Sequence, residues 1–133
     1  MVVRFEVPGE PVGKGRPRMT KTGHAYTPAR TREYEARMRE AYQTDAHGFV
    51  FEGPVRVIIN AYFAIPKSTP QYKVDMMMSD DIRPVKKPDL DNIVKTIDAL
   101  NGVAWHDDAA VVEIEARKFY DIHPRVEIEI KNV

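Results

Sequence analysis

Apolar and polar residues alternate in four segments of the chain, with the period of β-strands that bury one face. These segments are residues 2–7, 55–65, 111–120 and 125–133. The second of them, VRVIINAYFAI, is the strongest, because apolar residues fill nearly all of it, as in a strand at the centre of a sheet. The last two are separated only by Asp121–Pro124, so they are predicted to form a β-hairpin.

A helical period of apolar residues marks two further segments, 29–44 and about 91–100. The predicted buried stripe of the first helix is Tyr34, Met38, Ala41 and Tyr42. The predicted buried stripe of the second is Ile93, Val94, Ile97 and Leu100. The second helix is expected to end at Asn101–Gly102, where glycine suits a left-handed cap.

The segments between these elements are rich in proline and glycine or lack a period. Residues 8–28 combine Pro and Gly with basic residues and are predicted to form a long loop. Residues 66–85 are predicted to form a surface excursion with a short helical turn near Met76–Met78. The order β-α-β-α-β-β predicts a single α+β domain over residues 1–133, with a mixed sheet of about four to five strands flanked by two main helices.

Composition narrows the class of protein. A chain of 133 residues that is 43% hydrophobic is expected to bury a core. No run approaches the ~18 apolar residues of a membrane helix, and Arg4 and Glu6 interrupt the opening stretch, so neither a membrane span nor a signal peptide is expected. The absence of cysteine excludes disulfides, thiolate zinc sites and cysteine nucleophiles, and is compatible with a cytoplasmic location.

Charge is distributed unevenly although the formal net charge is zero. Residues 11–32 contain no acid and six basic residues, namely Lys14, Arg16, Arg18, Lys21, Arg30 and Arg32. Such a basic segment can bind a polyanion while acids elsewhere hold cations, or it can serve only solubility. His24 and Tyr26 lie in the same segment, either as contacts to a sugar-phosphate backbone or as exposed residues without a role.

Acidic residues bracket the second predicted helix, in the segment 86–108, KKPDLDNIVKTIDALNGVAWHDD. The acids are Asp89, Asp91, Asp107 and Asp108; the basic residues near them are Lys86, Lys87 and Lys95. Carboxylate oxygens suit Mg²⁺ or Mn²⁺, and lysines beside them suit phosphate. The pattern therefore indicates phosphoryl chemistry.

Backbone geometry decides whether these acids can act together. In an extended segment after Pro88, Asp89 and Asp91 would face the same side, whereas on a regular helix they would point about 200° apart. Lys95 would stand one turn above Asp91, and one of the Asp107–Asp108 pair could complete a metal site. A capping aspartate, an ion pair with Lys95 and a turn before a strand would explain the same residues structurally, so both interpretations remain open. Trp105 is expected to anchor the core.

The same segment resembles the signature of RusA-type Holliday-junction resolvases. That signature is roughly K-P-D-x-D-N, a lysine three residues later, D-A-L-N-G, an aromatic residue, and D-D shortly before a strand that ends in lysine. The matching positions are Lys87 to Asn92, Lys95, Asp98 to Gly102, Trp105, Asp107, Asp108 and Lys118. Ala110 departs from the pattern, because the family often has glutamine there.

The resemblance implies a cytoplasmic, bacterial or phage-encoded homodimer that cuts four-way DNA junctions with Mg²⁺, or Mn²⁺, and no organic cofactor. Asp89, Asp91 and Asp108 would bind the metal, with Asp107 as a further candidate, and Lys95 would be the catalytic lysine. The expected DNA contacts are Lys14, Arg16, Arg18, Lys21, Lys86, Lys87 and Lys118. Two alternatives are a branched-DNA-binding protein that does not cut, and a metal-dependent nuclease for flaps or other branched DNA.

Overall fold

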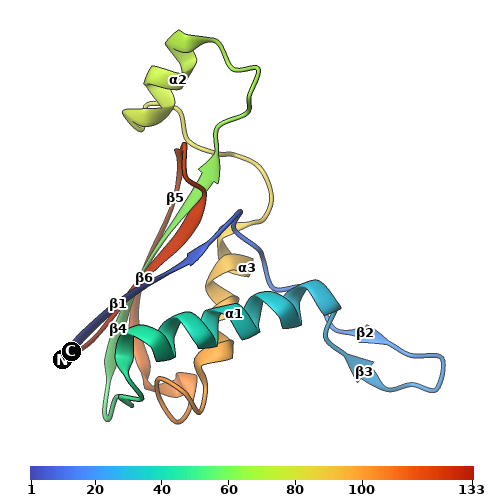
Figure 1. The fold of residues 1–133 in the computed structure, drawn as a ribbon. Coiled ribbons are helices and arrows are strands. Elements are labelled where there is room, and N and C mark those ends of the chain that lie inside the picture. Colours follow the sequence, from blue (N-terminus) through green and yellow to red (C-terminus); the bar gives the residue numbers. More distant parts are fainter.

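Four long strands form a mixed sheet in the computed structural model, which describes residues 1–133 (Figure 1). They are β1 (Val2–Pro8), β4 (Val55–Ala64), β5 (Val111–Asp121) and β6 (Arg125–Asn132). The order across the sheet is β1-β6-β4-β5, with β6 antiparallel to both neighbours and β5 parallel to β4. Helices pack against this sheet, so the α+β class and the mixed sheet are confirmed.

The predicted hairpin of the last two strands is wrong, because β4 lies between β5 and β6. Asp121 pairs with Ala64 on one side of β4, and Arg125 pairs with Tyr62 on the other, so the short link between them crosses β4. Every second residue of β4 is buried. Because β4 lies at the centre of the sheet, both of its edges pair with neighbouring strands. By contrast, β5 exposes Val112 and Ile114 and takes the edge of the sheet.

The long helix α1 (Ala29–Ala46) lies along one face of the sheet (Figure 1). Its buried residues are Thr31, Tyr34, Met38, Tyr42 and Ala46, which confirms the predicted stripe except that Ala41 is half-buried. Tyr42 meets Phe5 of β1 edge to face, with ring centroids 5.6 Å apart. The same core holds Trp105, which is fully buried and donates its Nε1 hydrogen to Asn101 Oδ1 at 2.7 Å. Trp105 is thus the core anchor that was predicted.

Two segments are more ordered than predicted. The supposed loop 8–28 contains a small hairpin of β2 (Arg18–Met19) and β3 (Ala25–Tyr26), which projects away from the body (Figure 1). A backbone hydrogen bond within Thr20–His24 closes its turn. The excursion 66–85 contains an eight-residue helix, α2 (Gln71–Met78), rather than a single turn.

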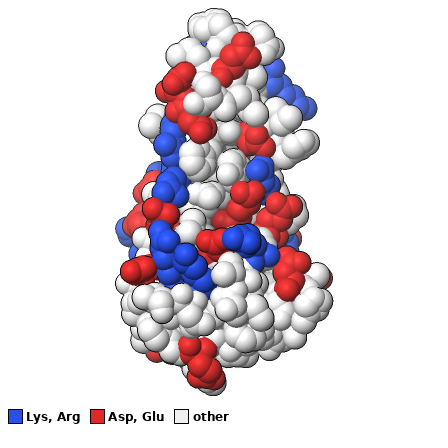
Figure 2. Space-filling view, turned by 90° about the vertical axis from the view of Figure 1, so that its left-hand side faces the viewer, with Lys and Arg blue, Asp and Glu red and all other residues white.

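The surface away from the hairpin carries balanced charge. In the view of Figure 2, basic and acidic side chains interleave over the middle of the molecule. Several ion pairs of the sheet follow this pattern, among them Arg4–Glu129, Arg56–Glu115 and Arg125–Asp121. No helix in the structure combines the length and the apolar character needed to cross a bilayer.

Candidate active site

The connection from β4 to its parallel neighbour β5 carries all the acids of the 86–108 segment. It includes α3 (Leu90–Lys95), the 3-10 helix η1 (Thr96–Leu100) that follows it directly and, after seven intervening residues, a second 3-10 helix, η2 (Asp108–Ala110). The predicted helix over 91–100 is therefore α-helical only in its first half. Ile93, Ile97 and Leu100 are buried as predicted, whereas Val94 is half-buried. The apolar side of α3 and η1 packs against the core, and this leaves Asp91 and Lys95 exposed to solvent.

Asp89 and Asp91 differ in backbone conformation. Asp89 is extended, with φ −65° and ψ 148°, but α3 already begins at Leu90, so Asp91 lies in its first turn. The prediction of an extended Asp-Leu-Asp segment is thus correct only for Asp89, and Leu90 is half-buried rather than in the core. Both carboxylates nevertheless line one cavity of about 330 Å³, together with Lys95.

Neither acid performs the structural role that the sequence left open. Asp89 precedes α3 but makes no side-chain capping hydrogen bond. Asp91 and Lys95 are exposed, and neither belongs to any ion pair of the structure. These three polar groups are therefore free to meet a ligand.

A glycine-containing loop closes the other side of the cavity. The backbone N–H of Lys14 donates to the carbonyl of Asn92 at 2.9 Å, and that of Gly15 donates to Thr31 Oγ1 at 3.0 Å. A Cβ on Gly13 would lie 2.8 Å from Cβ of Pro88, closer than real Cβ atoms approach. Residues 13–15 are therefore held tightly between α1 and the start of α3.

The loop directs Lys14 into the acidic cluster. Its Nζ lies 3.1 Å from Asp98 Oδ2 and 3.5 Å from Glu35 Oε2. Partial burial lowers the pKa of Lys14, but Asp98 and Glu35 outweigh this effect, so the pKa lies above its ordinary value. Lys14 thus has partners within the protein, while its predicted contact with DNA stays a prediction.

Asp98 is a site residue that the sequence interpretation did not select. Hydrogen bonding with Asp98 and with Asp107, together with a small burial effect and the charges of both, raises the pKa of Asp108. Asp98 therefore interacts both with Lys14 and with the Asp107–Asp108 pair. Its position seven residues after Asp91, on the same side of the predicted helix, was the signal that could have identified it.

The donor chemistry of the acids fits a hard divalent cation, since carboxylate oxygens are its preferred ligands. The close approach of Asp98 and Asp108 also suits a cation, which would relieve the repulsion between them. The structure nevertheless gathers no group of three or more acidic or histidine side chains in metal-binding geometry. Asp89, Asp91 and Asp98 line one cavity, and Asp98 also interacts with Asp108, which stands beside Asp107.

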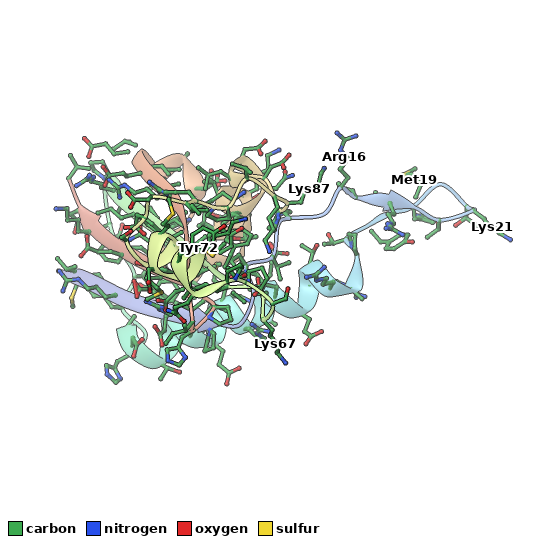
Figure 3. All side chains as sticks on the ribbon, turned by 90° about the horizontal axis from the view of Figure 1, so that it is seen from above. Arg16, Met19, Lys21, Lys67, Tyr72 and Lys87 are labelled. Carbon is green, nitrogen blue, oxygen red and sulfur yellow. The ribbon has the colours of Figure 1, made fainter.

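Most of the predicted DNA contacts line one groove. This groove has a volume of about 700 Å³ and is lined by Lys14, Arg16, Arg18, Lys86 and Lys87, among others. It shares Asp89 and Asn92 with the acidic cavity, so the two are continuous. Lys21 stands apart at the tip of the hairpin (Figure 3). Lys118 donates to the backbone carbonyl of Lys86 at 2.6 Å but does not itself line the groove.

Comparison with known proteins places these features in a family. The family model described as endodeoxyribonuclease RusA matches residues 8–131. The chain belongs to the RusA family. It is also similar to the uncharacterized protein YqaN of Bacillus subtilis (strain 168), with 35% identity over 137 residues that cover 98% of this chain and 96% of the relative. Membership of the RusA family supports an endodeoxyribonuclease that binds DNA junctions, and the match includes both the basic groove and the acidic cavity.

Proposed function

We propose that this protein is a divalent-metal-dependent endodeoxyribonuclease that resolves four-way DNA junctions by paired nicks in opposed strands. It would serve DNA recombination and repair in the cytoplasm of a bacterium, encoded by the host or by a phage. One observation carries the proposal: a basic groove runs into a cavity where Asp89, Asp91 and Lys95 have no structural role.

The groove is suited to the DNA backbone. Lys87, Arg16 and Arg18 are exposed and unpaired, so each can neutralise a phosphate. Binding of this kind depends steeply on salt and only weakly on base sequence. The continuity of groove and cavity would deliver one phosphodiester to the acids.

Mg²⁺, or Mn²⁺ in its place, would be held by Asp89, Asp91 and Asp108, with Asp107 as a further candidate. When bound, the metal supplies polarisation of the phosphate and a lower pKa for a water molecule. Lys95 would balance the negative charge that develops on the phosphate oxygens, because its ammonium is exposed on the same cavity.

A homodimer would match the two-fold symmetry of a four-way junction. Two copies of the chain, each with one acidic cavity, could cut opposed strands symmetrically. The assembly is tested by light scattering of the free protein and of its junction complex.

The test of the catalytic assignment is Asp91→Asn. This variant should lose cleavage in Mg²⁺ and keep its affinity for the junction, because Asp91 is exposed and makes no structural bond. Asp45→Asn is the matched control, since Asp45 is exposed near the far end of α1 and should leave cleavage unchanged. Full cleavage by Asp91→Asn would refute the assignment.

The substrate is tested with labelled four-way, flap and duplex DNA, each in Mg²⁺ and in EDTA. Paired nicks in the four-way DNA that require the metal are the expected result. Preferential cutting of flaps would instead identify a nuclease for other branched DNA. Junction binding without cleavage in any metal would identify a binding protein.

A further inference from the structure

The β2–β3 hairpin, residues 18–26, is set apart from the rest of the molecule. It extends into solvent with Arg16 near its base, Met19 along it and Lys21 at its tip (Figure 3). Its two strands form a separate sheet, in which Arg18 pairs with Tyr26 and Met19 with Ala25. We call this segment the arm. The hydrogen bonds at its turn join only residues of the arm itself.

The surface of the arm is unusual in two respects. Met19 is 64% exposed and Tyr26 45% exposed, so large apolar groups face water. Arg18 and Lys21 make no ion pair, whereas arginines of the sheet such as Arg56 and Arg125 are each paired. Residues 11–32 contain no acid that could neutralise the arm from within. The arm thus presents unneutralised cations together with apolar side chains.

Cross-strand pairing determines which of these groups act together. Residues opposite each other in an antiparallel pair project from the same face. Arg18 and Tyr26 therefore share one face of the arm, and Met19 and Ala25 share the other. The first face combines a guanidinium, which binds phosphate, with an aromatic ring, which stacks on a base.

We infer that the arm reads the branch point of the DNA, with Arg18 on a phosphate and Tyr26 stacked on a base that is unstacked where strands exchange. The inference rests on the proposed function, which supplies branched DNA as the substrate. A ring gains stacking energy only where the face of a base is accessible, and within a duplex both faces of each base are covered. Tyr26 therefore contributes to junction affinity and not to duplex affinity, while Arg18 contributes to both.

The experiment measures dissociation constants in EDTA for a four-way junction and for a duplex of the same length. Tyr26→Ala should weaken junction binding roughly 5- to 140-fold, the factor that matches the stacking of one base. Duplex binding should stay within about twofold of the wild type, since no stacking is lost there. Tyr26→Phe should bind the junction like the wild type, because the ring remains. Tyr72→Ala is the matched control: Tyr72 is 63% exposed on α2, and its loss should change neither constant.

A second measurement detects the stacking itself. A 2-aminopurine at the branch point should change its fluorescence on binding the wild-type protein and Tyr26→Phe, and should change much less with Tyr26→Ala at saturation. The thermal midpoint of each variant checks the fold, and it should equal that of the wild type because the arm has no part in the core.

The outcomes separate the inference from the proposed function. A wild-type protein that binds junction and duplex equally refutes the proposed function, and the inference falls with it. A wild-type preference for the junction that survives in Tyr26→Ala overturns the inference alone. Equal weakening on both DNAs also overturns it, because the ring would then contact a feature common to every duplex.

Discussion

Lys14→Gln tests the contact that joins the basic loop to the acidic cluster. The substitution removes the ammonium that lies 3.1 Å from Asp98 and 3.5 Å from Glu35. Ion pairs on the surface contribute roughly 0.2–1 kcal/mol, and breaking a buried pair costs about 3–5 kcal/mol. The Lys14 side chain is 26% exposed, between the two cases, and Asp98 is more open than Glu35. We therefore expect the variant to lose about 1–2 kcal/mol of unfolding free energy.

Scanning calorimetry at pH 7 measures this loss. For a domain of this length it corresponds to a fall of roughly 4–7 °C in the thermal midpoint. Arg16→Gln is the matched control, because Arg16 lines the same groove but makes no ion pair. The control should unfold at the same temperature as the wild type. It should reduce the slope of the logarithm of the junction-binding constant against the logarithm of the salt concentration by about 0.9.

Two results would contradict this reasoning. A Lys14→Gln protein with the wild-type midpoint would show that the ion pairs with Asp98 and Glu35 do not stabilise the fold. A salt slope reduced as much as in Arg16→Gln, with an unchanged midpoint, would place the ammonium on DNA instead of on Asp98.

Three further substitutions test other parts of the structure. Burial raises the pKa of Tyr34 to about 12, and its hydroxyl has no hydrogen-bond partner. Tyr34→Phe should therefore increase the free energy of unfolding by about 1 kcal/mol. It should also abolish the loss of stability that the wild type is expected to show as pH rises from 10 through 12, which thermal melts at pH 7 and 11 would measure. Gly13→Ala must displace Pro88, so the rate constant of junction cleavage in single-turnover assays should fall about 10- to 100-fold. An unchanged rate constant would refute the tight fit of the loop. Burial alone would raise the pKa of Asp121, but Arg125 and two backbone hydrogen bonds hold this pKa below its ordinary value of 3.8. Asp121→Asn should therefore be less stable than the wild type by about 1 kcal/mol at pH 7, as measured by urea titration. The difference should disappear as the pH falls through the lowered pKa.

The periodic patterns predicted the buried faces of β1, β4 and β6, but they did not predict that β5 buries no residue fully, nor which strands are neighbours. Alternation along β5 and β6 correctly identified two strands, and Ile93, Ile97 and Leu100 were correctly assigned to the core. Their pairing was wrong because alternation describes the faces of a strand and not its edges, while the insertion of β4 depends on contacts distant in the sequence.

The candidate site was predictable where its residues are close in the sequence. Asp89, Asp91 and Lys95 share a cavity as expected, because a single helix start positions them. The contact of Lys14 with Asp98 was not predicted, since it joins residues that only the folded chain brings together. The metal role of Asp89, Asp91 and Asp108 stays a prediction.

The anchoring of the glycine loop has a consequence for how weak contacts combine. The backbone N–H of Gly15 is hydrogen-bonded to Thr31, and the residues that lead into the arm line the acidic cavity. The arm is therefore attached to the body of the protein by a short, fixed segment next to that cavity. In the inferred role of the arm, DNA bound to it would be confined to a small volume around that cavity, so a further contact there would be intramolecular and favoured by a high effective concentration. A longer and more flexible connection between arm and body would lower this effective concentration without removing any contact.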